Sequence, residues 1–203
     1  MLGLARHSLA RLASPCARLA GRPLVAGRPF SVARTWRVYL SGEIHSDWRA
    51  VIASGVEQRG LPVQLTAPNA IHEDSDDCGA LILGDEETRM NYDGKGAKLN
   101  AIRTRTLIEE ADIVVVRFGE KYKQWNAAFD AGYAAAKCKP LVIVHPPELG
   151  HMLKEVDAAA LAVCQVPDQV VDILDYTITG RLPQPKPGFQ TMMERLGAGN
   201  PNP

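Results

Sequence analysis

Ile113-Val114-Val115-Val116-Arg117-Phe118 is the most strand-like stretch of the chain, an almost unbroken run of β-branched and aromatic side chains. Such a run is typical of a strand buried on both faces of a parallel sheet. Four other strand-like segments occupy residues 36–41, 63–66, 141–144 and 163–166. Segments with helix-like spacing of apolar residues separate them, so the sequence predicts an α/β fold. We expect a single three-layer, doubly wound parallel sheet of about five strands in the flavodoxin-like order 2-1-3-4-5, with helices on both faces.

The spacing of apolar residues predicts helices over residues 48–58, 97–111, 125–137, 149–161 and 168–177. The third of these is expected to bury a stripe made of Trp125, Ala128, Phe129, Gly132 and Ala136. Residues 68–96 are polar and contain several glycines, so they are predicted to be irregular apart from a short helix over 85–90. Ligands of such sheets bind beyond the carboxyl ends of the strands. The site is therefore expected where residues 41–45, residues 118–125 and the start of the helix that carries Asp130 meet.

The beginning of the chain differs from the rest in its charge. Residues 1–42 contain seven Arg and no Asp or Glu, among many Ala, Leu and Ser. This composition predicts a transit peptide over residues 1–34, with processing after Phe30 and import into the mitochondrial matrix. It does not exclude a chloroplast address. The α/β domain is expected over residues 35–179, followed by a disordered tail rich in Pro and Gly over residues 180–203.

Composition also indicates the class of partner. Removal of residues 1–30 takes five of the 23 Lys and Arg away and leaves 18 against 23 Asp and Glu. A mildly acidic domain is a poor match for a nucleic acid polymer. No apolar run approaches the ~18 residues of a membrane span. The cysteines have no zinc-like spacing, and phosphate- or dinucleotide-binding glycine motifs are absent. The sequence therefore predicts a small-molecule ligand, with no metal and no cofactor.

Residues 118–134 are the segment richest in reactive and ring-bearing side chains. Glu120 and Asp130 supply carboxylates, while Tyr122 and Trp125 could stack on a flat ring. In a helix, residues three and four positions from Asp130 are small or able to hydrogen-bond, so a ligand could reach its carboxylate. The alternative is that Asp130 is an ordinary solvated helix residue.

Two strings in the sequence point to a known family. Tyr39-Leu40-Ser41-Gly42-Glu43-Ile44-His45-Ser46-Asp47-Trp48-Arg49 and Phe118-Gly119-Glu120-Lys121-Tyr122-Lys123-Gln124-Trp125-Asn126 resemble the YtoQ family. That family is grouped with the nucleoside 2-deoxyribosyltransferases. The resemblance covers about residues 36–178. It implies the same α/β fold, whereas function has to be argued from the site itself.

The resemblance also implies roles for individual residues. In the wider group a helix with the pattern Glu-x-Gly-Tyr-Ala carries the nucleophile that attacks the anomeric carbon of the deoxyribose. This sequence reads Asp130-Ala131-Gly132-Tyr133-Ala134, which puts Asp130 at that position. The group often has an Asp two helical turns before the third strand, where this chain reads Arg103-Thr104-Arg105-Thr106. The acid that handles the base is therefore unassigned, with Glu43 and Glu120 as candidates. The residues expected to contact substrate are Tyr39, Ser41, Gly42, His45, Gly119, Tyr122, Trp125, Asn126 and Arg103.

Three functions follow as alternatives. The first is exchange or cleavage of the N-glycosidic bond of a deoxynucleoside by double displacement. The second is hydrolysis of the same bond in a nucleoside 5′-monophosphate, with Arg103, Arg105 or Lys121 near the phosphate. The third is a binding module for a nucleotide or metabolite that has the fold without the chemistry. The resemblance also implies that a homo-oligomer is possible.

Overall fold

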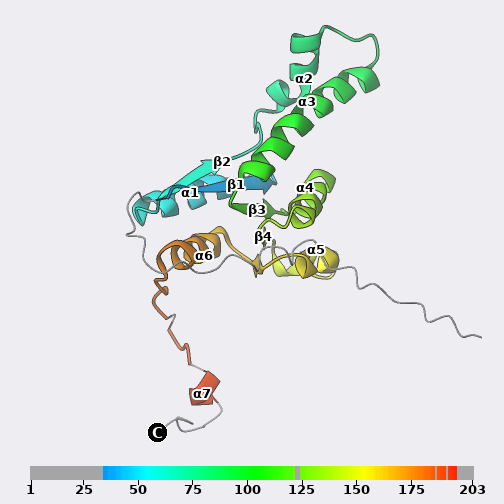
Figure 1. The fold of residues 1–203 in the computed structure, drawn as a ribbon. Coiled ribbons are helices and arrows are strands. Elements are labelled where there is room, and N and C mark those ends of the chain that lie inside the picture. The colour runs from blue at the N-terminus through cyan, green and yellow to red at the C-terminus, as the bar shows by residue number, and fades with distance from the viewer. Residues whose placement is uncertain (1–33, 122–123, 186, 191, 196–203) are drawn as a thin grey trace, which may run out of the picture.

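The computed structural model describes residues 34–121, 124–185, 187–190 and 192–195. Its centre is one parallel sheet of five strands, in the order β2-β1-β3-β4-β5 (Figure 1). The strands are β1 (Trp36–Gly42), β2 (Val63–Thr66), β3 (Ile113–Arg117), β4 (Leu141–Val144) and β5 (Ala162–Cys164). Val38 lies opposite Ile113, and Val115 lies opposite Val142. The predicted fold class and strand order are confirmed.

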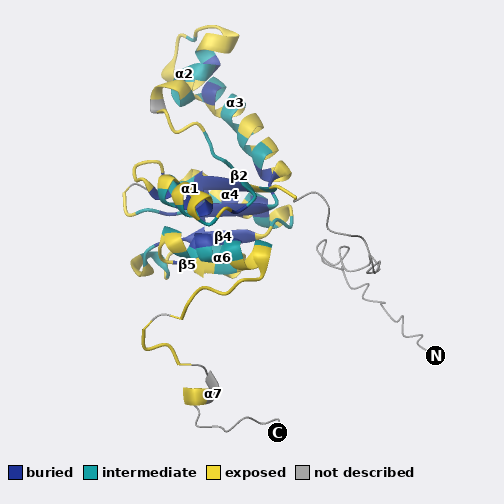
Figure 2. Cartoon of the chain, turned by 90° about the vertical axis from the view of Figure 1, so that its left-hand side faces the viewer, coloured by how far each residue is buried: buried dark blue, intermediate teal, exposed yellow. Residues whose placement is uncertain are grey.

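Each face of the sheet has its own core. On one face α1 (Trp48–Gln58) and α6 (Pro167–Thr179) pack together and bury Trp48, Ile52 and Leu174 against the strands. On the other face α4 (Trp125–Ala136) and the end of α3 (Arg89–Glu110) cover the sheet. Figure 2 shows the buried strands between exposed helix surfaces. Burial on both faces explains why the central strands are almost entirely apolar.

The apolar stripe predicted for α4 is wrong. The helix buries Ala127, Ala131 and Ala134 against the sheet, while Trp125 is 73% and Phe129 58% exposed. Small side chains allow the helix backbone to approach the sheet closely, which bulky rings would prevent. The aromatic residues are therefore turned away from the core, and both border the cavity described below.

The segment predicted to be irregular is instead a helical hairpin. α2 (His72–Leu83) packs mainly against the first half of α3, and together residues 72–100 form an arm that projects from the sheet (Figure 1). A Cβ atom on Gly79 would lie 2.4 Å from the backbone nitrogen of Gly96, so glycine allows the two helices to touch. Thr88 caps α3 by accepting a hydrogen bond from the Asn91 backbone. Within the arm the two helices pack against each other and not against the sheet. Neither helix therefore needs the apolar stripe by which a sheet-packing helix is recognised in a sequence.

The end of the domain differs from expectation in smaller ways. The helix predicted over 149–161 is split into a 3-10 turn, η2 (Pro147–Leu149), and the short helix α5 (Lys154–Ala158). His145 is buried and its Nε2 lies 3.1 Å from Asp157 Oδ2, which ties α5 to the end of β4. The short helix α7 (Met192–Arg195) lies within the predicted tail.

Residues 1–33 of the predicted transit peptide, which include its processing site, lie outside the described residues. Within the part of the chain that the structure describes, no helix combines the length and the apolarity needed to cross a bilayer.

Candidate active site

A sharp turn at the end of β1 opens the site. Gly42 has a φ of +103°, and a Cβ atom at this position would lie 2.1 Å from the carbonyl oxygen of Arg117. Only glycine can adopt this backbone so close to the neighbouring strand. The next residue, Glu43, donates its backbone N–H to the same Arg117 carbonyl at 3.0 Å. The turn places Ser41 and the residues after it at the carboxyl edge of the sheet.

Arg49 stabilises this turn through hydrogen bonds to its backbone. Its guanidinium donates to the carbonyl oxygens of Leu40 at 3.1 Å, Gly42 at 3.0 Å and Glu43 at 2.7 Å. A planar guanidinium can satisfy several acceptors at fixed angles. Arg49 therefore fixes the backbone on both sides of Ser41.

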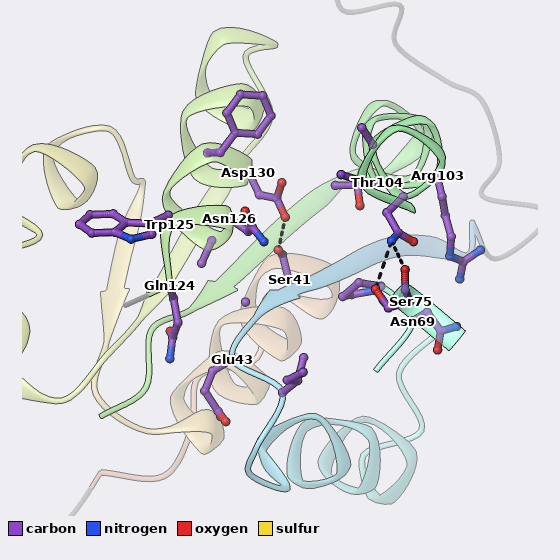
Figure 3. Close-up of a pocket in the computed structure, with 18 of the residues that line it drawn as sticks. Ser41, Glu43, Asn69, Ser75, Arg103, Thr104, Gln124, Trp125, Asn126 and Asp130 are labelled. Carbon is purple, nitrogen blue, oxygen red and sulfur yellow. Dashed lines mark hydrogen bonds between the residues drawn. The ribbon is translucent and has the colours of Figure 1, made fainter. Parts of the chain in front are cut away.

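Asp130 meets Ser41 across the edge of the sheet. The Ser41 hydroxyl, which is 1% exposed, donates to Asp130 Oδ2 at 2.5 Å, and the two residues come from β1 and α4 (Figure 3). Burial raises the pKa of the Asp130 carboxyl above its ordinary value, and the hydrogen bond from Ser41 partly opposes this rise. The site thus holds a partly desolvated carboxylate in a fixed orientation.

Tyr39 lies beside this pair. Its side chain is fully buried, and among the described residues its hydroxyl has no hydrogen-bond partner of normal geometry. Burial raises the pKa of Tyr39; the nearby Thr104 hydroxyl opposes the rise and the charge of Asp130 adds to it. A buried hydroxyl without a partner is unusual in folded proteins.

Ser41 and Asp130 line one side of a cavity of about 540 Å³, which the predicted substrate residue Tyr39 does not border. Ser41, Asn126 and Asp130 lie on the sheet side, while Ser75, Asp76 and Asn100 from the arm lie on the other. The rings of Trp125 and Phe129 border it from α4. This volume is ordinary for a small-molecule site.

Glu43 does not have the environment of a proton donor. It is 5% exposed, accepts hydrogen bonds from the His45 backbone and the Ser46 hydroxyl, and lies 3.6 Å from Arg117 Nε. Burial alone would raise the pKa of Glu43, but these partners outweigh it and the pKa is lowered. In Figure 3 its carboxylate points away from Asp130. We infer that Glu43 stabilises the loop as a carboxylate, although it borders the cavity.

The other predicted site residues divide into two groups. Gly42, His45, Trp125, Asn126 and Arg103 border the same cavity as Ser41 and Asp130. Glu120 is exposed and Gly119 is partly buried, and neither borders the cavity. A Cβ atom on Gly119 would lie 2.5 Å from Glu43 Cγ, so this glycine leaves room for the loop carboxylate. Tyr122 lies outside the described residues.

Sequence reasoning missed the residues that the arm brings to the cavity. These are Ser75, Asp76, Asp93 and Asn100. Ser75, Asp76 and Asp93 lie in residues 68–96, which were predicted to be irregular, and Asn100 lies in the helix predicted over 97–111, so no pattern placed them opposite Asp130. Within the described residues, no cluster of three or more His, Cys, Asp or Glu side chains is arranged to hold a metal ion.

Comparison with known proteins shows the family to which this chain belongs. Residues 39–178 match the family described as nucleoside 2-deoxyribosyltransferase YtoQ. A relative in Bacillus subtilis (strain 168), described as the uncharacterized protein YtoQ, is 42% identical over 139 residues, which are 68% of this chain and 94% of the relative.

Two solved structures are more distant. A 2-deoxyribosyltransferase from Bacillus psychrosaccharolyticus has a TM-score of 0.42 and 17% identity, over 67% of this chain and 90% of its own. A conserved protein from Enterococcus faecalis V583 has a TM-score of 0.49 and 12% identity, over 71% of this chain and 99% of its own. Likenesses at this level carry no weight for function.

Proposed function

Because this chain belongs to the nucleoside 2-deoxyribosyltransferase YtoQ family, we propose that it cleaves the N-glycosidic bond of a 2-deoxynucleoside and transfers the sugar to a second base. The observation that carries this proposal is Asp130, a partly buried carboxylate fixed by Ser41 at the wall of a cavity. A solvated helix carboxylate would have neither the desolvation nor the partner.

The proposed reaction is a double displacement. One oxygen of the Asp130 carboxylate attacks C1′ of the sugar, and the electron pair of the C1′–N bond leaves with the base. A ring nitrogen of the second base then attacks C1′, the bond between C1′ and the Asp130 oxygen breaks to restore the carboxylate, and water carries the proton of that nitrogen to the departed base. Ser41 holds Oδ2 so that the other oxygen is presented to the sugar. Tyr39 is fully buried and does not border the cavity, so no contact with the substrate is assigned to it.

The test is turnover by the full-length chain with a panel of deoxynucleosides, with and without a free acceptor base. Base exchange that disappears in Asp130→Ala and persists in Glu120→Ala supports the proposal. Glu120 is the matched control because it is an exposed carboxylate that does not border the cavity. Binding without turnover in the folded wild-type protein would refute the enzyme and leave a binding module.

A hydrolase is the second candidate, because three cationic residues border the same cavity. These residues are Arg103, Arg105 and Lys121. Guanidinium groups suit the 5′-phosphate of a nucleoside monophosphate. Release of free base from monophosphates, without exchange and with loss in Arg103→Ala, would favour the hydrolase over the transferase.

Self-association is proposed from the surface of the arm. Leu81 is 82%, Ile82 69% and Met90 80% exposed, all near the tip. Exposed apolar groups of this kind are typical of protein contacts. Light scattering of the full-length chain would show an oligomer, and Leu81→Asp would reduce its mass. A monomer at all concentrations would refute this.

Localisation in mitochondria is proposed from the Arg-rich, acid-free residues 1–42. A fluorescent fusion to the C-terminus of the chain should enter mitochondria, and removal of residues 1–30 should abolish entry. Plastid import, or unchanged location after the deletion, would contradict the proposal.

A further inference from the structure

Ser75 fixes the side chain of Asn100 on the arm. The Asn100 amide nitrogen donates to the carbonyl oxygen of Ser75 at 2.8 Å and to its hydroxyl oxygen at 3.1 Å, and Figure 3 shows both hydrogen bonds. A carbonyl oxygen can only accept hydrogen bonds, so it determines which end of the amide carries the nitrogen. The amide oxygen of Asn100 therefore lies on the side away from Ser75.

This amide oxygen is a hydrogen-bond acceptor at the wall of the cavity. Asn100 is partly buried and borders the cavity, and none of the described residues donates a hydrogen bond to its amide oxygen. Ala97 and Ala101 border the cavity from the same helix, and their short side chains leave room for a flat ring beside Asn100. An acceptor that loses water without gaining a donor costs free energy, so a ligand at this wall is expected to supply a donor.

The geometry of the proposed reaction brings the base to this wall. Displacement at C1′ requires the attacking oxygen and the departing nitrogen to lie on opposite sides of the carbon. Asp130 lies on the sheet side of the cavity, on α4, whereas Asn100 lies on the arm. A sugar attacked by Asp130 therefore has its base extending across the cavity toward Asn100.

We propose that Asn100 makes the site require a base with an N–H donor on the edge remote from the sugar. This inference rests on the proposed function, because that reaction is what directs the base to the arm. The amino group of adenine or cytosine meets the requirement, and so does the ring N–H of hypoxanthine, uracil or thymine. A base without such a donor displaces water from the Asn100 oxygen and leaves it unpaired. Asn100 thus selects for a donor and not between amino and oxo bases.

The test measures binding to full-length Asp130→Ala, a variant that cannot form the glycosyl-enzyme intermediate. Calorimetry compares deoxyadenosine and deoxyinosine with deoxynebularine, whose purine has a hydrogen in place of the amino group and no N–H on this edge. Deoxycytidine and deoxyuridine are compared in the same way with the deoxyriboside of 2-pyrimidinone. Each donor-bearing nucleoside should bind about tenfold more tightly than its donor-free counterpart.

Two substitutions, each added to Asp130→Ala, assign this preference to Asn100. Asn100→Leu nearly keeps the volume of the side chain and removes the acceptor, and Asn100→Ala removes the acceptor with the residue that best favours a helix. Either should bring every ratio close to one. Asn91→Leu is the matched control, because Asn91 is an exposed asparagine of the same helix that does not border the cavity. It should leave every ratio unchanged.

Equal binding of donor-bearing and donor-free nucleosides, or binding of none of them, would overturn the inference. So would ratios that persist in a folded Asn100→Leu or Asn100→Ala variant, or that disappear equally in Asn91→Leu.

Failure of the proposed function is distinguishable from failure of this inference. A donor requirement in binding without turnover by the wild-type protein would refute the transferase alone. Turnover by the wild-type protein with equal binding of the two kinds of nucleoside would refute the donor requirement alone.

Discussion

Replacement of Ser41 by alanine tests the central contact of the site. The hydroxyl donates to Asp130 Oδ2 at 2.5 Å in a position that is 1% exposed, so water cannot replace it fully. A hydrogen bond to an ionised group contributes about 1.5–3 kcal/mol, and one between neutral groups about 0.5–1.5 kcal/mol. Ser41→Ala should therefore lower the free energy of unfolding by about 2 kcal/mol where Asp130 is ionised, and by about half of that where it is protonated.

The pH dependence of kcat/KM should also change in Ser41→Ala. The Ser41 hydrogen bond lowers the pKa of Asp130, so its loss raises that pKa further. The reaction needs the ionised carboxylate, and the acid limb of the kcat/KM profile should move to higher pH. Loss of orientation should also reduce kcat/KM above that limb by about tenfold or more.

The assay is urea unfolding and deoxynucleoside turnover across a pH series. Ser46→Ala is the control, because Ser46 also donates to a carboxylate, Glu43. The pKa of Glu43 is lowered, so this carboxylate stays ionised above its ordinary pKa of 4.5, and in that range the loss of stability in Ser46→Ala should be independent of pH. A pH-independent loss in Ser41→Ala as well, with the acid limb unmoved, would refute the reasoning.

Three further predictions concern stability. The raised pKa of Asp130 means that the folded state holds a proton that the unfolded chain loses near the ordinary value of 3.8, so stability falls as pH rises through the window between the two pKa values. Asp130→Asn should unfold at higher urea concentration than wild type at pH 7, with the gain shrinking in acid; equal midpoints at every pH would contradict this. Gly42→Ala should cost about 2–4 kcal/mol because its Cβ meets the Arg117 carbonyl, whereas Gly60→Ala, at φ +60° with nothing within 4 Å, should cost about 1–2 kcal/mol; thermal unfolding compares them, and equal losses would show that the close contact is unimportant. Arg49→Lys should lose about 1.5–3 kcal/mol by the same measurement because an ammonium cannot span three carbonyl groups, and full stability would refute that role for the guanidinium.

The strand pattern and the position of Asp130 were accessible from the sequence for a physical reason. Burial of a parallel sheet on both faces requires apolar side chains, so residues 113–116 and Leu141–Val144 can be recognised as strands without knowledge of their neighbours. Alternation of these strands with helices then restricts the topology to few orders. The helix that follows β3 necessarily starts at the carboxyl edge, which placed Asp130 beside the end of β1.

The reverse holds for the arm and for the orientation of α4. Periodicity reports only which face of a helix is apolar, and α4 has aromatic residues on the face that borders the cavity and alanines on the face that packs. The close approach of Gly79 to Gly96 joins two polar helices whose mutual contact leaves no stripe in either sequence.

The sequence alone therefore determined the sheet, its order and the family resemblance, because these depend on local burial and on motifs within single segments. The tertiary structure alone showed that Glu43 is engaged by Ser46 and Arg117, and that Asp76 and Asn100 lie across a cavity from Asp130. Hydrogen bonds and cavity walls join residues that are distant in the chain, and no local pattern records which distant partner a side chain meets.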